Sequence, residues 1–342
     1  MSPQVRVIVV NHNGGADLRR CLEALSAQTM TEFEVIVVDN ASSDGSAVCV
    51  KDADGRFTLL PLSENVGFAA ANNRGAEDVN AELIATLNPD AFPQADWLER
   101  LCAAAADHRD VAMFGSTQIS DRDPSRFDGV GDAYLSAGIP WRGEHGRAVT
   151  PLPPLAKTFS PCAAAALYRR DAFESIGGFD EAFFCYCEDI DLGFRLRLQG
   201  QRCFQVADAR VRHIGSASTG KRSTFAIYHG ARNRIWVMVK NMPLPLLVIA
   251  LPLHAVTLLP LTLRAAMHRG EIRAMWRGVW HALLGLGPML RKRREIQRSA
   301  TVGWLTIARA MTWSPWRYLG RRADLRPLDQ ASGQARRAPT GQ

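Results

Sequence analysis

The sequence lacks the cysteine patterns of zinc-binding and disulfide-stapled proteins. Its seven cysteines include no CxxC pair, and the two nearest to each other, Cys185 and Cys187, are separated by a single residue. A structural zinc site needs four ligands at recognisable spacings, and a disulfide framework uses an even number of cysteines. We therefore expect reduced cysteines, most of them small buried hydrophobic residues, in a reducing compartment.

The start of the chain, MSPQVRVIVV, has no charged leader, no long apolar run and no small-residue cleavage site. These are the parts of a secretory signal peptide, so we expect none here and a cytoplasmic protein. The chain has 342 residues, of which 47% are hydrophobic and 22% charged. That is enough to bury a sizeable core in one large α/β domain with an appendage, or in two domains.

Acidic residues are scarce in the last third of the chain. Residues 221–342 hold 21 Lys and Arg against 4 Asp and Glu, whereas residues 1–220 hold 20 against 30, and the net charge is +7. This asymmetry predicts an acidic body and a basic tail that meets something anionic. Zinc-finger, RRM and helix-turn-helix signatures are absent, so we do not expect nucleic acid to be the partner.

Short apolar runs alternate with amphipathic segments over the first 120 residues. This alternation predicts an α/β fold, with a mostly parallel sheet covered by helices on both faces. Strands are expected at 5–11, 33–40, 57–62, 82–88 and 111–119, and helices at 16–28, after Asp44, at 68–78 and at 95–107. In such sheets, ligands bind beyond the carboxyl ends of the strands.

The segment 120–157 breaks this rhythm and is expected to be a long loop or an insertion, as in lids over functional sites. A strand at 162–170, a helix from about Glu188 and a last strand at 202–213 are then predicted.

Polar motifs follow the predicted strands. The first four are VVNHNGG (9–15), VVDNASSDGS (37–46), ENVGFAAANNRG (64–75) and LNPDA (87–91). Asn11 and Asn13 can hydrogen-bond a base, although a strand-ending turn would use the same residues. Asp39 is placed to bind a base or ribose, or to cap the next helix, and Asp44 fits the cap better.

The other motifs also have two interpretations each. Asn72 could bind a ligand or belong to the polar face of a helix. Asp90 could hold a divalent cation such as Mg²⁺, or be part of an ordinary Asn-Pro-Asp turn. His213 could ligate the metal or touch a diphosphate, or be a surface histidine. Arg232 or Arg234 could neutralise a diphosphate, or belong to a basic helix face.

The sharpest motif is GGFDEAFFCYCEDIDL (177–192), where Glu188, Asp189 and Asp191 cluster at a helix start. The helix dipole favours carboxylates there, so one of the three could be only a cap. A general base must be ionised and within reach of the acceptor hydroxyl, and this cluster is the best source of one.

Taken together, these motifs in this order resemble glycosyltransferase family 2 over residues 4–240, especially its rhamnosyltransferase-like branch. The resemblance implies a GT-A fold and an inverting, one-step displacement at the anomeric carbon of the sugar. It also implies a donor-nucleotide site made of Asn11, Asn13, Asp39, Asn65, Gly67 and Asn72.

The resemblance further implies a Mg²⁺ or Mn²⁺ ion held by Asp90 and His213, and a catalytic base, Asp189, with Glu188 beside it. Many family members carry two aspartates where this chain has Asn88-Pro89-Asp90, and the single acidic residue fits the rhamnosyltransferase-like branch. The implied donor is rhamnose or another deoxy-hexose on a dTDP or UDP carrier. The implied acceptor is a hydroxyl of a glycan or lipid-linked molecule in cell-surface polysaccharide synthesis. The alternative is a non-catalytic nucleotide-sugar-binding or scaffold protein on the same fold.

The predicted organisation is a catalytic domain over 1–240, a helical apolar and basic region over 241–325, and a disordered tail over 326–342. Residues 242–263 carry no Asp, Glu, Lys or Arg but four prolines. Their length suits a membrane span, but prolines oppose a regular helix. A kinked segment lying in the membrane interface and a buried subdomain packed on the catalytic body remain equal alternatives. We expect peripheral association with the inner face of the membrane.

Overall fold

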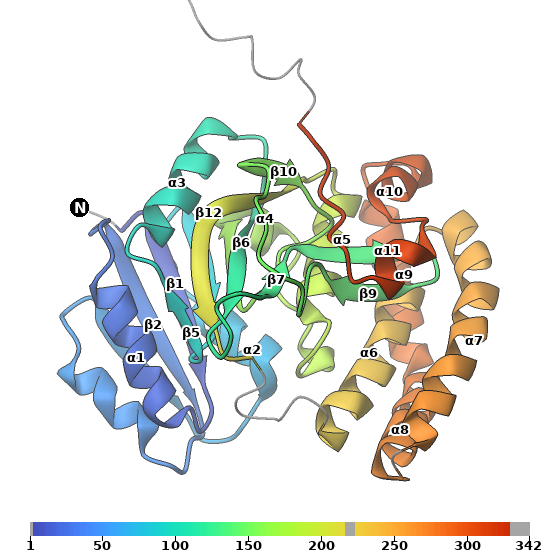
Figure 1. The fold of residues 1–342 in the computed structure, drawn as a ribbon, viewed down its shortest axis with the longest axis horizontal. Helices are drawn as coiled ribbons and strands as arrows, with labels where there is room; N and C mark the ends of the chain where they lie inside the picture. The colour runs from blue at the N-terminus through green and yellow to red at the C-terminus, as the bar shows by residue number, and fades with distance from the viewer. Residues whose placement is uncertain (1–2, 216–222, 268, 329–342) are drawn as a thin grey trace, which may run out of the picture.

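The computed structural model describes residues 3–215, 223–267 and 269–328, and a mixed ten-stranded sheet lies at its centre (Figure 1). The main path of the sheet runs β10-β12-β6-β11-β4-β1-β2-β3, with β5 paired to β12 and β7 to β6. Strands β1 to β4 are parallel neighbours, and β6 is parallel to β12. Strand β11 runs antiparallel between β4 and β6. The predicted α/β class is confirmed.

The strands that carry the predicted motifs have the predicted positions. They are β1 (Val5–Asn11), β2 (Phe33–Asn40), β3 (Phe57–Leu62), β4 (Leu83–Leu87), β6 (Met113–Ser120), β11 (Ala165–Arg169) and β12 (Cys203–His213). A three-residue strand, β5 (Ala91–Pro93), follows β4. The residues of β4 are all buried, which explains its unbroken apolar run, because a central strand is covered on both faces.

Helices cover both faces of the sheet. Helices α1 (Gly15–Ser26) and α3 (Trp97–Asp107) pack their apolar residues on one face. Helices α2 (Gly67–Gly75), α4 (Arg170–Ser175) and α5 (Glu188–Leu198) pack on the other. The helix expected after Asp44 is a short 3₁₀ helix, η1 (Ser46–Asp52).

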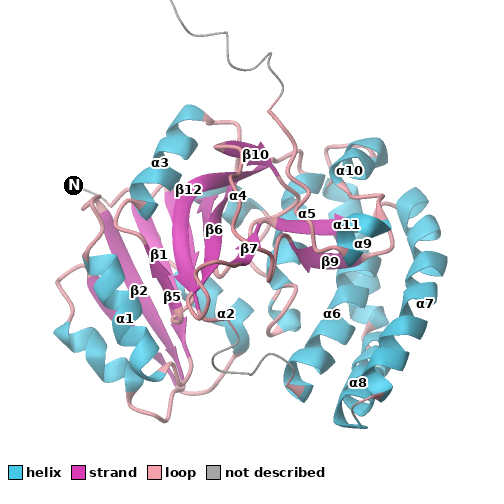
Figure 2. Cartoon of the chain, in the orientation of Figure 1, coloured by secondary structure: helices cyan, strands magenta, loops and turns pink. Residues whose placement is uncertain are grey.

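The segment 120–157 differs from the long loop expected from its composition. It forms β7 (Phe127–Val130), β8 (Asp132–Leu135), β9 (Ile139–Arg142) and β10 (Leu155–Lys157), and β8 pairs with β9 in a hairpin (Figure 2). Gly131 and Gly138 take positive φ values of 63° and 75° beside β8. Strands of three or four residues contain too few alternating positions for a period-two pattern to stand out.

The C-terminal region is helical. It comprises α6 (Thr224–Asn241), α7 (Leu244–Ala266), α8 (Arg269–Leu284), α9 (Leu286–Ser299), α10 (Trp304–Ala310) and α11 (Pro315–Leu319). The expectation that prolines would interrupt 242–263 is wrong, because α7 continues through Pro252 and Pro260. Both prolines lie on the exposed side of α7. Most of the tail predicted to be disordered, from residue 329 on, lies outside the described residues.

A buried ion cluster joins α5 to α6. The Nζ of Lys240, which is 1% exposed, lies 2.7 Å from Asp191 and 2.5 Å from Asp180. Asp191 also binds Arg195 at 2.8 Å and accepts a hydrogen bond from Asn241 at 2.7 Å. Asp191 is therefore a packing residue of α5, because its two oxygens are occupied by buried partners.

The end of the described chain returns to the hairpin. Thr312 forms a bridge with Leu135 of β8, and Arg326 forms one with Lys157 of β10. The segment 312–326 therefore braces the strands that come from residues 120–157.

Helix α8 approaches α6 at Gly278, where an added Cβ would lie 2.4 Å from the carbonyl oxygen of Tyr228. Gly278→Ala should lower the free energy of unfolding by about 1–3 kcal/mol, because a packed backbone cannot absorb the methyl group. Gly287 of α9 is the matched control, since a Cβ there meets no described atom within 4 Å. Gly287→Ala should raise stability by up to about 1 kcal/mol. Urea unfolding followed by circular dichroism measures both, and equal effects would contradict this packing.

Candidate active site

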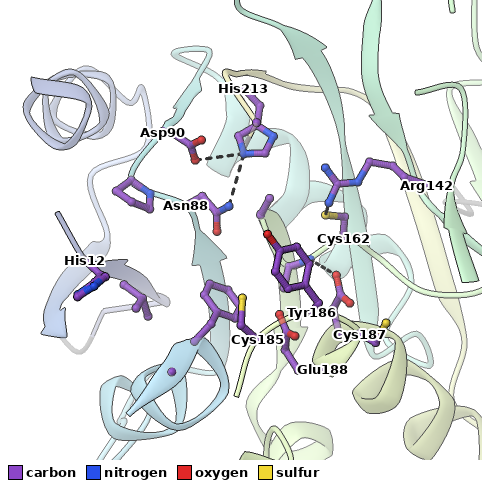
Figure 3. Close-up of a pocket in the computed structure, with 18 of the residues that line it drawn as sticks. His12, Asn88, Asp90, Arg142, Cys162, Cys185, Tyr186, Cys187, Glu188 and His213 are labelled. Atoms are coloured by element: carbon purple, nitrogen blue, oxygen red, sulfur yellow. Dashed lines mark hydrogen bonds and ion pairs between the residues drawn. The ribbon is translucent and has the colours of Figure 1, made fainter. Parts of the chain in front are cut away.

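A cavity of about 1000 Å³ opens at the carboxyl ends of the parallel strands (Figure 3). Its wall is made by the loops after β1, β4 and β12, by the hairpin β8–β9, by the start of α5 and by residues of α6. Asp90 and Asp189, which lie 99 positions apart in the chain, both line it. The predicted metal ligand and the predicted base therefore face one shared cleft.

The residues predicted to bind the donor nucleotide divide into two groups. Asn13, Asn65 and Gly67 line the cavity. Asn11 and Asp39 lie behind this wall, where Asn11 Nδ2 donates to Asp39 Oδ1 at 3.0 Å. The same nitrogen donates to the hydroxyls of Ser42 and Ser46, and Asn11 Oδ1 accepts from Gly14 N–H. The pair thus fixes the loops after β1 and β2 against each other.

Asn72 differs from the expectation. It is buried in α2, and its Nδ2 donates to the carbonyl of Phe68 one turn earlier at 2.9 Å. It does not line the cavity. Helical periodicity shows which residues share a face of a helix, but it does not show what that face contacts. The sequence therefore could not tell which face of α2 borders the cavity.

Asp90 and His213 are brought together by the pairing of β5 with β12, in which His213 lies opposite Ala91. His213 Nε2 is 3.2 Å from Asp90 Oδ1 (Figure 3). His213 Nδ1 is 2.8 Å from Asp128 Oδ2. Burial disfavours the imidazolium, but the hydrogen bonds to Asp128 and Asp90 outweigh it and raise the pKa of His213 to about 9. The proton on His213 Nε2 serves the contact with Asp90, and a metal ion held by both residues would displace this proton.

The Asp90–His213 pair has the chemistry of a divalent-cation site. A carboxylate oxygen and an imidazole nitrogen suit Mn²⁺ or Mg²⁺, which complete their shells with phosphate oxygens and water. The second ring nitrogen of His213 is held by Asp128, as is usual for histidines that ligate metals. Sequence reasoning missed Asp128, because it lies in a short strand of the segment expected to be a loop.

The two carboxylates at the start of α5 differ in their surroundings. Asp189 Oδ2 accepts from the backbone N–H of Ala163 at 3.3 Å. Burial raises the pKa of Asp189, and the charge of Arg142 opposes this effect. Burial and then the charge of Asp189 raise the pKa of Glu188 well above its usual range.

A second acidic cluster lies beside Asp189. Oxygens of Asp132 and Asp189 and the sulfur of Cys162 all lie within 4.8 Å of one another. Burial, with the charge of Asp189, raises the pKa of Asp132 to about 8. Arg142 Nη2 donates to Cys162 Sγ at 2.6 Å, so the guanidinium of Arg142 supplies the positive charge beside this cluster. The sequence signal for Asp132 is a charged residue between glycines and apolar residues, FDGVGDAY, within the segment expected to be a loop.

Arg232 and Arg234, expected near the diphosphate, do not line the cavity. Arg232 Nη2 donates to the carbonyl of Phe183 at 2.9 Å, and its guanidinium lies 4.4 Å from the ring centroid of Trp236. Burial lowers the pKa of Arg234. Sequence spacing placed both on α6 but could not show that α6 turns Arg232 toward protein partners and keeps Arg234 out of the cavity.

Residues 6–177, half of the chain, match the family model "Glycosyl transferase family 2", and the chain belongs to this family. It is 32% identical over 226 residues to the O-antigen biosynthesis protein RfbC of Myxococcus xanthus. The matched region covers 64% of this chain but only 18% of that protein. It is 28% identical over 254 residues to the N-acetylglucosaminyl-diphospho-decaprenol L-rhamnosyltransferase of Mycobacterium tuberculosis. The matched region covers 67% of this chain and 82% of that protein. The predicted likeness to the rhamnosyltransferase-like branch is thus confirmed.

Solved structures show the same fold. The mannosyltransferase PcManGT of Pyrobaculum calidifontis, in complex with GDP-Man and Mn²⁺, has a TM-score of 0.52 at 20% identity and covers 93% of this chain and 88% of its own. S. aureus TarS 1–349, in complex with UDP-GlcNAc, has a TM-score of 0.54 at 17% identity, and the match covers 92% of this chain and 93% of that chain. The expected GT-A fold is confirmed.

The loop before α5 depends on one buried side chain of α6. Asn233 Nδ2 donates to the carbonyls of Phe183, Cys185 and Tyr186 at 3.0, 2.8 and 2.7 Å. Asn233→Asp, nearly the same shape, should lower the free energy of unfolding by about 2 kcal/mol or more, because an acceptor replaces the shared donor. Asn233→Ala should cost less, since it adds no buried charge. Urea unfolding orders the two variants, and an Asp variant as stable as the Ala variant would contradict this role.

Proposed function

We propose that this glycosyltransferase moves a deoxy-hexose, rhamnose foremost, from a dTDP or UDP carrier to a hydroxyl of a glycan or lipid-linked acceptor, with inversion. The observation that carries the proposal is the shared cavity of Asp90, His213 and Asp189. The sugar class rests on the likeness to a protein named as an L-rhamnosyltransferase. The acceptor class rests on the same likeness and on the apolar surface described below.

In this proposal the nucleoside lies against Asn13, Asn65 and Gly67, with Asn11 and Asp39 holding the loops. Gly67 has a φ of 86°, and a Cβ there would lie 2.5 Å from the ring of Phe184. The absence of a side chain therefore lets the start of α2 meet the aromatic loop before α5. Close backbone approach of this kind is what a nucleotide pocket at a strand edge requires.

Asp90 and His213 would hold Mg²⁺ or Mn²⁺ against the diphosphate, with Asp128 fixing the ring of His213. Such an ion neutralises the negative charge that grows on the leaving diphosphate. Asp189 accepts the proton of the acceptor hydroxyl as that oxygen attacks the anomeric carbon. One ionised carboxylate on this side suffices for inversion, because no sugar–enzyme bond has to form. Glu188 lies beside the base, and its raised pKa disfavours a second negative charge there.

Asp189→Asn should lower sugar transfer by about 10²–10⁴-fold, because it removes the proton acceptor. Glu188→Gln is the matched control and should cost less than about tenfold, since it keeps the shape of a side chain whose raised pKa favours the protonated form. Nucleoside-diphosphate release is followed over a panel of dTDP and UDP sugars, with and without EDTA. EDTA should abolish turnover, and added Mn²⁺ should restore it. An Asn variant as active as wild type would refute the assignment of the base, and no release from any donor would favour a non-catalytic binding protein.

We also propose that the C-terminal helices lie on the membrane surface. The segment Leu244–Leu263 is long and apolar enough to cross a membrane, but 22% of it is buried inside the protein. Its inner side packs Leu246 and Leu247 and joins His254 Nδ1 to the carbonyl of Ala137 at 2.9 Å. Its outer side exposes Val256 by 72%. A helix with one side on protein and one apolar side uncovered suits the bilayer interface better than a span.

Helix α8 supports the same proposal. Its exposed stripe carries Trp276 and Trp280 together with Arg273 and Arg277. Tryptophan favours the headgroup layer, and arginine is drawn to anionic lipids while its stem covers apolar surface. A lipid-linked acceptor would then reach the cavity from the surface on which the enzyme rests.

Trp276→Ser with Trp280→Ser should weaken binding to vesicles containing anionic lipid at least about fivefold, because two interfacial anchors are lost. Val48→Ser is the matched control: Val48 is 62% exposed on η1, in the catalytic body, and its loss should change nothing. Vesicle cosedimentation measures the binding, and neutral vesicles and raised salt should weaken it. Wild-type protein that does not bind vesicles and forms dimers through these helices would contradict the proposal.

A further inference from the structure

The cavity contains a half-buried arginine, Arg142, that the proposed reaction has not used. We propose that Arg142 is a positioning residue: its guanidinium joins Asp128 on the metal side to Asp132 and Cys162 on the base side, which lie within 4.8 Å of Asp189, and so keeps Asp189 beside a cation. The inference rests on the proposed role of Asp189 as the base. Arg142 itself contacts neither the leaving group nor the attacking hydroxyl in this proposal.

The guanidinium reaches both sides of the site. Its Nη1 is 3.0 Å from Asp128 Oδ2, and its Nε is 4.0 Å from Asp132 Oδ1. Asp128 is the carboxylate that holds the ring of His213, and Asp132 lies opposite Arg142 in the β8–β9 hairpin. Pairing in the hairpin therefore sets the separation of cation and carboxylate without help from a ligand.

Gly129 makes the room for this side chain. A Cβ added at Gly129 would lie 2.4 Å from Cδ and 2.6 Å from Cγ of Arg142. Real Cβ atoms are not found that close to carbon. The stem of Arg142 consequently passes over the glycine backbone, and 31% of the side chain is exposed toward the cavity.

Charge balance around Asp189 gives Arg142 its function. Burial makes the charged form of Asp189 costly, and the charge of Arg142 is the strongest effect that opposes it. The pKa of Asp132 is about 8, so Asp132 is mostly protonated at neutral pH. The single negative charge of the Asp132–Asp189 pair can then lie on Asp189. The other titratable groups that interact with Asp189 are Glu188, Cys162, Cys185, Cys187 and Tyr168.

Arg142→Gln should therefore move the acid limb of the kcat/KM profile upward by at least about one pH unit. Without the cation the pKa of Asp189 rises further and less base is ionised at a given pH, so activity is lost on the acid side of the profile and recovered as the pH is raised. Arg142→Lys keeps the charge and should keep the limb within a few tenths of a unit. Gly129→Ala, which displaces the stem, should shift the limb in the same direction as Arg142→Gln but by less.

Arg147→Gln is the matched control, because Arg147 pairs with Glu144 at the surface, and it should leave the profile in place. Thermal melting of each variant reports folding, and the Arg142→Lys and Gly129→Ala variants carry the test if Arg142→Gln does not fold. An Arg142→Gln variant that raises KM for donor or acceptor without moving the limb would make Arg142 a substrate contact and overturn the proposal. An inactive Asp189→Asn with an unmoved limb in Arg142→Gln would refute this inference alone, whereas an active Asp189→Asn would refute the proposed base.

Discussion

The buried contact of Lys240 with Asp191 is the constraint on which the site depends. Asp191 lies two residues after Asp189, and Lys240 lies near the end of α6. Both charges are almost fully buried and belong to one network with Asp180 and Arg195, so neither partner can move away without breaking a buried ion pair, which typically costs about 3–5 kcal/mol. The start of α5, and with it the proposed base, is thereby fixed to the helical region. Residues of that region also line the cavity, so it forms part of the candidate active site.

Chemically identical side chains have different states in this cavity because their partners differ. Cations and hydrogen bonds overcome the burial of Asp128 and lower its pKa. Asp132, buried next to Asp189, has a raised pKa instead. One cleft can therefore hold both a carboxylate suited to a cation, beside His213, and an ionisable carboxylate, near Arg142. In the proposed reaction, the first would act on the leaving group and the second on the attacking oxygen.

The sequence predicted those parts of the molecule whose signal is local. Central strands such as β4 are unbroken apolar runs, and residues at their ends, such as Asp90, share one edge of the sheet whatever the rest of the fold does. The direction in which a helical side chain points was harder to predict. Asn72 and Arg232, expected to face the ligand, contact protein groups instead. Asp132 and Arg142 were missed because they become neighbours only through a hairpin of four-residue strands. Long-range pairing of that kind leaves no periodic trace in the chain.

The return of the chain end to the hairpin has a consequence for synthesis on the ribosome. The loops after β1 and β2 use residues made early, so the nucleotide side can fold while the chain is still growing. The bridges of Thr312 to Leu135 and of Arg326 to Lys157 can form only after residues 312–326 have been made. The strands from residues 120–157, which carry Asp132 and Arg142, are therefore completed only after the apolar helices α7 and α8 have been synthesised.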